Sequence, residues 1–210
     1  MCAANNPLPR HWILTPETIA QRLARPPLPD APEDLHLIPI PPGARVTEAA
    51  VMVPLVPRPS GVQVLLTQRT PHLSDHPGQI SFPGGRVEPS DETREETALR
   101  ETEEEIGLLR DRVTILGRLP DYEIPTGFRI TPVVGWAEPP FDLELDAFEV
   151  AAAFEVPLAH FLDLTRFQRR EYQFRGRHRH YMAVPFGGRY IWGATAGMLY
   201  SLARILSHPQ

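Results

Sequence analysis

Three glutamates and an arginine lie close together in the middle of the chain, at Arg100, Glu101, Glu104 and Glu105. They follow a Pro-Gly-Gly turn within residues 85–108, GRVEPSDETREETALRETEEEIGL. On an α-helix, positions three and four apart share a face, so these carboxylates repel one another by about a few tenths of a kcal/mol per pair. A divalent cation removes the repulsion, and hard Mg²⁺ suits such oxygens and commonly bridges to substrate phosphates. The sequence therefore predicts a metal site for phosphorus chemistry.

The flanking residues predict a short, anchored helix rather than a merely solvated acidic face, which is the common explanation for a charge run. Thr93 and Glu96 form a capping box, and Gly107 stands where a C-cap glycine belongs. The apolar stripe consists of Ala98, Leu99, Thr102 and Ile106. Before the helix, residues 80–85 (ISFPGG) predict a strand end and a glycine turn that lets the backbone approach a ligand.

This segment resembles the Nudix box, whose pattern is G-x5-E-x7-R-E-U-x-E-E-x-G-U, with U an aliphatic residue. Residues 92–108 fit at every position except the first U, where Thr102 stands. Gly85 lies one residue too far from Glu92, and Asp91 stands at the spacing that the glycine predicts. Either residue can be the outer carboxylate, and we prefer Glu92 because it keeps register with the helix. A pattern with this many fixed positions is specific.

The resemblance implies the roles of the site residues. The expected metal ligands for Mg²⁺ or Mn²⁺ are Glu101, Glu104, Glu105 and a backbone carbonyl near Gly85. Arg100 is expected to hold the glutamates in place, with Glu96 as its partner at i to i+4 spacing. The catalytic base is left open among Glu105, Glu101 and Glu149. Glu149 precedes a Val-Pro-Leu segment, and a solvated loop carboxylate is an equally good interpretation of it.

Residues 65–85 resemble a second signature, LLTxR(S)xxxxxHxGQISFPGG, of the coenzyme A pyrophosphatase branch. The usual arginine two residues before the histidine is replaced by Ser74. Together with later segments, the resemblance spans about residues 47–205. It implies substrate contacts by Arg69, His76, Gln79, Gly84 and Gly85, although a structural role for His76 is equally open. The arginines at 175, 177 and 179 offer a basic edge for a 3′-phosphate, but a charged edge strand that prevents aggregation is the preferred explanation.

Composition limits the classes of protein that the chain can belong to. With 210 residues and a formal net charge of −5, a single domain is expected, and generic nucleic-acid binding is unfavourable. No apolar run approaches the ~20 residues that cross a bilayer, and no signal peptide is recognisable, so a cytoplasmic enzyme without membrane contact is expected. The single cysteine, Cys2, excludes an intrachain disulfide. All 21 basic residues are arginine, which we attribute to genome composition.

The chain divides into an N-terminal extension, residues 1–46, and a Nudix hydrolase domain, residues 47–210. Thr15 and Pro16 open a helix that runs to about Arg25, and the proline-rich residues 26–42 predict a stiff connector. The remaining elements are strands at 51–56, 62–69, 113–119 and 130–137, a hairpin at 172–174 and 181–184, and a closing helix at 194–206. This order predicts an α/β fold with both faces of a mixed sheet covered. The Nudix resemblance implies the same α/β/α sandwich.

The expected reaction is hydrolysis of the diphosphate of coenzyme A or its acyl derivatives, giving 3′,5′-ADP and 4′-phosphopantetheine or its acyl form. An alternative substrate is another nucleoside diphosphate derivative, such as ADP-ribose or a dinucleotide. A non-catalytic module that binds a nucleotide is a third alternative, although such a module has no need for three mutually repelling glutamates. Whether the chain forms a homodimer is left open.

Overall fold

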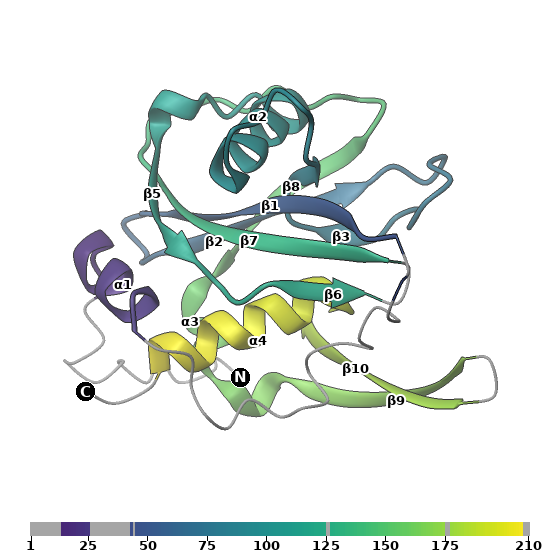
Figure 1. Ribbon diagram of the computed structural model, residues 1–210. Coiled ribbons are helices and arrows are strands. Elements are labelled where there is room, and N and C mark those ends of the chain that lie inside the picture. The colour runs from purple at the N-terminus through teal and green to yellow at the C-terminus, as the bar shows by residue number, and fades with distance from the viewer. Residues whose placement is uncertain (1–13, 26–42, 44, 125–126, 175–176, 208–210) are drawn as a thin grey trace.

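A mixed β-sheet forms the centre of the protein (Figure 1). The computed structural model describes residues 14–25, 43, 45–124, 127–174 and 177–207. The strands of this sheet are β1 (Thr47–Val56), β2 (Gln63–Arg69), β3 (Ile80–Ser81), β4 (Gly84–Arg86), β5 (Val113–Arg118), β6 (Tyr122–Ile124), β7 (Phe128–Ala137) and β8 (Val150–Pro157). The order β3-β2-β1-β7-β5 runs through the sheet, while β4 pairs with β1, β6 with β7 and β8 with β2.

The centre of the sheet is a parallel pair of long strands. β1 and β7 pair from Thr47 opposite Phe128 to Leu55 opposite Trp136. Both strands are almost continuously buried toward their C-terminal ends, as expected for a sheet that is covered on both faces. Figure 1 shows α2 (Arg94–Ile106) on one face and α4 (Ala194–Ser207) on the other. The predicted α/β/α sandwich is confirmed.

A second, three-stranded sheet lies below the central sheet in Figure 1. It consists of β9 (Gln168–Phe174), β10 (Arg177–Phe186) and β11 (Arg189–Trp192), in the order β11-β10-β9. The predicted hairpin is therefore present but longer than expected. The sequence did not reveal β11, β6, β8 or β4. Gly84 and Gly85, which were expected to form a turn, lie in β4, because they pair with Val51 and Ala50 of β1. β8 reads VAAAFEVP, whose run of alanines lacks the alternation that marks a half-buried strand.

The first helix joins the main hydrophobic core. α1 (Pro16–Leu23) begins after Thr15, whose hydroxyl accepts a hydrogen bond from the Thr18 backbone N–H at 3.3 Å. The predicted start is correct, while the helix ends two residues before Arg25. Ile19 is fully buried in the same cluster as Phe161 and Leu199. α3 (Leu158–Leu162) and the 3₁₀ turns at Arg110–Arg112 and Leu164–Arg166 complete the elements.

Some sequence-based expectations concern residues outside the described ranges. These are Cys2, the proline-rich connector at 26–42, and Arg175 of the basic edge. The division of the chain at residues 46 and 47 stays a prediction.

Candidate functional site

The carboxylate helix α2 is fixed at both ends by its own sequence. The Thr93 hydroxyl accepts a hydrogen bond from the Glu96 N–H at 3.2 Å, and the Glu96 carboxylate accepts one from the Thr93 N–H at 3.3 Å. Gly107 ends the helix in the left-handed conformation with φ of 68°. Three of the four residues of the predicted apolar stripe, Ala98, Thr102 and Ile106, are buried, whereas Leu99 is half-buried. The predicted capping box and C-cap are thus confirmed.

Arg100 connects α2 to the loop before it. Its guanidinium donates to both carboxylate oxygens of Asp91 at 3.1 and 3.0 Å, and to the Arg86 carbonyl at 3.1 Å. It also donates to Glu101 Oε1 at 2.9 Å and to Glu104 Oε2 at 3.1 Å. The Arg100 side chain is only 17% exposed and that of Asp91 only 5%. These bonds hold the pKa of Asp91 far below its ordinary value.

Two residues were left as candidates for the outer carboxylate, and Arg100 bonds Asp91, the one at the spacing from Gly85. The backbone N–H of Glu92, the candidate that we preferred, donates to the Glu96 carboxylate at 2.6 Å. One expectation about Arg100 is wrong. Glu96 does not pair with Arg100, because its carboxylate caps the N-terminus of α2.

Glu101 lies directly against the glycine turn. A Cβ atom built on Gly85 would overlap the Glu101 carboxylate, so any side chain at position 85 would displace that group. Gly84 is also restricted, since it has φ of 153° and a Cβ there would overlap the backbone of β1 at Ala50 and Val51. Burial raises the pKa of Glu101, and the hydrogen bond from Arg100 opposes this effect. The two glycines therefore let the backbone approach the carboxylate closely.

Glu105 is the buried member of the acidic cluster, with only 6% of its surface exposed. Its carboxylate accepts a hydrogen bond from the Gly84 backbone N–H. Burial, followed by the negative charges of Glu149 and Glu101, raises the pKa of Glu105 to about 8, while the positive charge of Arg69 opposes this rise. Glu105 is thus within electrostatic range of Glu101, Glu149 and Arg69.

Backbone hydrogen bonds fix Glu149 beside the end of β2. Its carbonyl accepts from the Thr70 N–H at 2.9 Å, and its own N–H donates to the Asp146 carbonyl at 3.0 Å. The Asp146 N–H in turn donates to the Glu105 carbonyl at 2.9 Å. The Glu149 backbone is therefore part of an ordered turn that adjoins Glu105, and the role of its carboxylate stays a prediction.

The donor chemistry of this cluster fits a divalent cation, because several carboxylates repel one another around one backbone turn. The three glutamates of α2 differ in their contacts with the rest of the protein. Arg100 holds Glu101 and Glu104, Glu104 is 60% exposed, and Glu105 faces Gly84. Accordingly, in the described part of the chain no three histidine, cysteine or acidic side chains are grouped as ligands for one ion. The ligand set stays a prediction.

The predicted substrate residues occupy the segment between β2 and β3. The Arg69 backbone N–H donates to the Gln79 carbonyl at 2.9 Å, and the Arg69 Nε donates to the Asp75 carbonyl at 3.4 Å. His76 is exposed and has a positive φ of 55°, and its carbonyl accepts from the Gln79 N–H at 3.2 Å. Arg69 is thus brought near the carboxylates, whereas His76 lies on an exposed turn.

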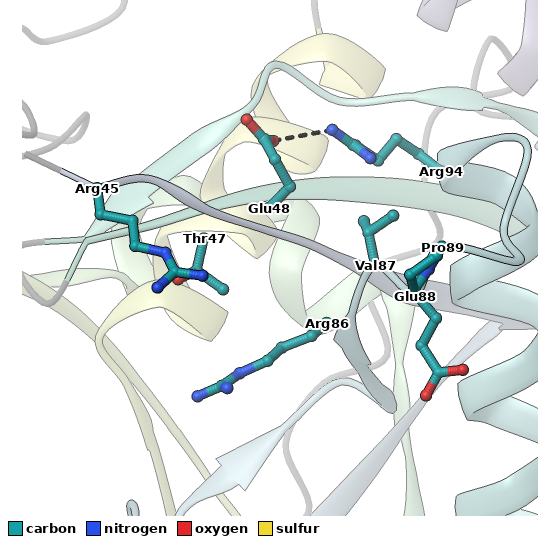
Figure 2. Close-up of a pocket in the computed structure, with 8 residues that line it drawn as sticks. All are labelled: Arg45, Thr47, Glu48, Arg86, Val87, Glu88, Pro89 and Arg94. Carbon is teal, nitrogen blue, oxygen red and sulfur yellow. Dashed lines mark hydrogen bonds and ion pairs between the residues drawn. The ribbon is translucent and has the colours of Figure 1, made fainter.

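Sequence reasoning missed a pocket beside the glycine turn (Figure 2). It has a volume of about 640 Å³, and its lining includes Arg45, Glu48, Arg86 and Arg94. The available signal was the position of Arg86, which follows Gly85 directly in β4.

A membrane-spanning helix is also absent from the residues that the structure describes, since none of their helices is both long and apolar enough to cross a bilayer.

Comparisons with known proteins agree with this geometry. The NUDIX domain family matches residues 46–175. A Klebsiella pneumoniae protein named "Uncharacterized Nudix hydrolase NudL" is 41% identical over 156 residues, covering 74% of this chain and 81% of the relative. The protein of the same name from Escherichia coli strain K12 is 40% identical over the same shares.

Among solved structures, a Caenorhabditis elegans Ap4A hydrolase binary complex has a TM-score of 0.46 and 25% identity. That likeness covers 54% of this chain and 82% of the other. The family assignment therefore depends on the sequence matches and on the strand, glycine turn and carboxylate helix described above. The chain belongs to the Nudix hydrolase family.

Proposed function

We propose that the protein hydrolyses the diphosphate bond of coenzyme A or an acyl-coenzyme A, releasing 3′,5′-ADP and 4′-phosphopantetheine or its acyl form. Membership of the Nudix hydrolase family supports a pyrophosphatase that acts on a nucleoside diphosphate derivative. The observation that carries the proposal is the acidic cluster at the glycine pair, where Glu101 lies against Gly85 and Glu105 accepts a hydrogen bond from the Gly84 N–H. Glu149 and Arg69 lie within electrostatic range of Glu105. Coenzyme A as the substrate is supported by the LLTQR and GQISFPGG segments at residues 65–69 and 78–85.

Each residue has a definite task in this proposal. Nudix hydrolases generally use divalent metal ions, and Glu101, Glu104, Glu105 and the Gly85 carbonyl would hold Mg²⁺ or Mn²⁺ here. The ion supplies charge neutralisation for the diphosphate and lowers the pKa of a bound water. Arg100 positions the carboxylates of Glu101 and Glu104.

The proton of the attacking water passes to a carboxylate oxygen of the same cluster. Glu105 and Glu149 are the candidates that the geometry favours, since they lie within electrostatic range of each other. Burial raises the pKa of Glu105 to about 8, and a carboxyl group whose pKa is near neutral is an effective proton acceptor. We assign the base to this pair rather than to Glu101, whose Oε1 accepts a hydrogen bond from Arg100.

The test is a substrate panel. Purified protein with Mg²⁺ or Mn²⁺ is incubated with coenzyme A, acetyl-coenzyme A, ADP-ribose and diadenosine polyphosphates, and the products are separated by chromatography. Preferential release of 3′,5′-ADP from the coenzyme A compounds is the expected result. Preference for another substrate would retain Nudix chemistry and refute coenzyme A as the substrate. Absence of turnover on all of them would favour the non-catalytic binding module.

A further inference from the structure

The pocket beside the glycine turn lies at the beginning of β1, outside the carboxylate cluster. Its lining combines Arg45, which precedes β1, and Thr47 and Glu48 of β1 with Arg86 of β4 and Arg94 of α2. Its volume of about 640 Å³ is within the range of sites that bind small molecules. The pocket therefore has the size and the polar lining of a ligand subsite.

Of the two acidic residues that line the pocket, Glu48 and Glu88, Glu48 is already neutralised. Glu48 forms two ion pairs. Its Oε2 lies 3.0 Å from Arg94 Nη2, and its Oε1 lies 3.2 Å from Arg129 Nη1. Arg94 is thus committed to a partner within the protein. The Glu88 carboxylate is turned away from the other guanidinium groups in Figure 2.

Two further guanidinium groups of the pocket are not neutralised in this way. Arg45 and Arg86 are exposed, and within the described ranges neither forms an ion pair with a carboxylate. The Arg86 guanidinium lies over the Phe128 ring, 5.3 Å from its centroid. Figure 2 shows both side chains extending toward the same side of the pocket. Although the protein has a net charge of −5, these two guanidinium groups give the pocket a local positive charge that would attract an anion.

The pocket adjoins the carboxylate site without being part of it. Arg86 follows Gly85 directly, and its carbonyl accepts a hydrogen bond from Arg100 Nη2 at 3.1 Å. Successive residues of a strand face opposite sides, so the Arg86 side chain points away from the side on which Gly85 meets Glu101. An anion held by Arg86 is therefore a different group from a diphosphate held by the glutamates.

We propose that Arg45 and Arg86 form a subsite for a phosphomonoester of the substrate, which is the 3′-phosphate if the substrate is coenzyme A. This identification builds on the proposed function. Arginine forks match phosphate oxygens and donate charge-assisted hydrogen bonds, and the Thr47 hydroxyl is a further donor in the same lining. The subsite would thus distinguish a substrate by a phosphate that is not itself hydrolysed.

The experiment compares coenzyme A with dephospho-coenzyme A, which differs only by the 3′-phosphate. For the wild-type protein we expect kcat/KM to be about tenfold higher for coenzyme A, equivalent to about 1.4 kcal/mol. Arg86→Ala and Arg45→Ala should each lower this ratio toward one, chiefly by raising KM for coenzyme A. Arg86→Lys should retain part of the preference, because it keeps the charge and loses the fork.

Arg110→Ala is the matched control, because Arg110 is exposed and its Nε pairs with Glu103 at 3.1 Å outside the pocket. It should leave the ratio of the two substrates at the wild-type value. Since Arg45 and Arg86 are exposed, the midpoint temperature of thermal unfolding of their variants should remain close to that of the wild type.

A binding measurement separates this inference from the proposed function. If coenzyme A is not hydrolysed, the proposed function fails, and calorimetric titration with 3′,5′-ADP and with 5′-AMP still tests the subsite. Tighter binding of 3′,5′-ADP that is lost in Arg86→Ala would support it. Equal binding of the two nucleotides by the wild-type protein, or a preference that survives in both alanine variants, would overturn it.

Discussion

At the scale of single residues, the acidic cluster is defined by what each carboxylate contacts. Residue types and spacing were enough to predict that Arg100, Glu101, Glu104 and Glu105 belong together. They were not enough to predict the individual environments, because a helical repeat does not reveal that Glu105 is 6% exposed while Glu104 is 60% exposed. The partner of Arg100 also depended on how the loop absorbs one extra residue.

The pairing of Arg100 with Asp91 is directly testable. Asp91→Asn removes a nearly buried charge that accepts two bonds from Arg100, so we expect the free energy of unfolding to fall by about 2 kcal/mol. Glu92→Gln changes an exposed side chain and should stay within about 0.5 kcal/mol of wild type. Urea unfolding measures both. A larger loss of stability for Glu92→Gln than for Asp91→Asn would favour Glu92 as the outer carboxylate.

Glu105 predicts a pH dependence of stability in the metal-free protein. Its folded pKa, about 8, is above the ordinary value of 4.5, so between these pH values the unfolded chain ionises Glu105 while the folded protein keeps it protonated, and folding becomes less favourable as the pH rises. The contribution is absent below about pH 4.5 and grows as the pH rises toward about 8, reaching a few kcal/mol at most. Glu105→Gln should flatten this part of the curve, measured by urea unfolding between pH 5 and pH 8. As a control, Glu92→Gln should keep the wild-type dependence of the unfolding free energy on pH. An equally steep dependence for Glu105→Gln would contradict the assignment of this effect to Glu105.

At the scale of elements, the helix α2 and the glycine pair before it were predictable because their signals are local. A capping box, a C-cap glycine and a glycine pair each act within a few residues. That the glycine pair lies in β4 rather than in a turn depends on pairing with β1 and was not predicted. The strand β8 and the turn that carries Glu149 were also harder to predict, because the placement of β8 depends on pairing with β2, nearly ninety residues earlier in the chain. The sequence left the role of Glu149 undecided; the structure gives the position of its backbone beside Thr70.

Gly85→Ala tests the close approach of the turn to α2. Because its Cβ would overlap the Glu101 carboxylate, we expect a loss of about 1–3 kcal/mol in stability and a marked loss of activity. Thermal unfolding and turnover measure the two effects. In the double variant Gly85→Ala/Glu101→Asp, the shorter acid provides room, so stability should recover while activity stays low. If Gly85→Ala were as stable and as active as wild type, the proposed packing would be wrong.

At the scale of the whole molecule, the sandwich followed from the sequence, whereas the role of the first helix did not. Residues 1–46 were expected to form an extension, yet Ile19 of α1 is fully buried among residues from the rest of the chain. This contact was not predicted because α1 is only eight residues long and its single buried apolar side chain gives little periodicity.

Ile19→Ala should therefore destabilise the whole protein. Removing a fully buried isoleucine typically costs about 2–5 kcal/mol, so the urea midpoint should fall with an unchanged slope. Glu17→Ala, on the exposed side of the same helix, is the matched control and should have little effect. An Ile19→Ala variant as stable as this control would show that α1 is dispensable.

We propose that the cluster on α2, together with the glycine pair, carries out metal-dependent hydrolysis of a coenzyme A diphosphate. The rate of 3′,5′-ADP release from coenzyme A with Mg²⁺, for the wild-type protein and for Glu101→Gln, tests this proposal. We expect release by the wild type that stops when the metal is chelated, and a rate on the order of a hundredfold lower in the variant. Equal rates for the two proteins, or release that persists with the metal chelated, would contradict it.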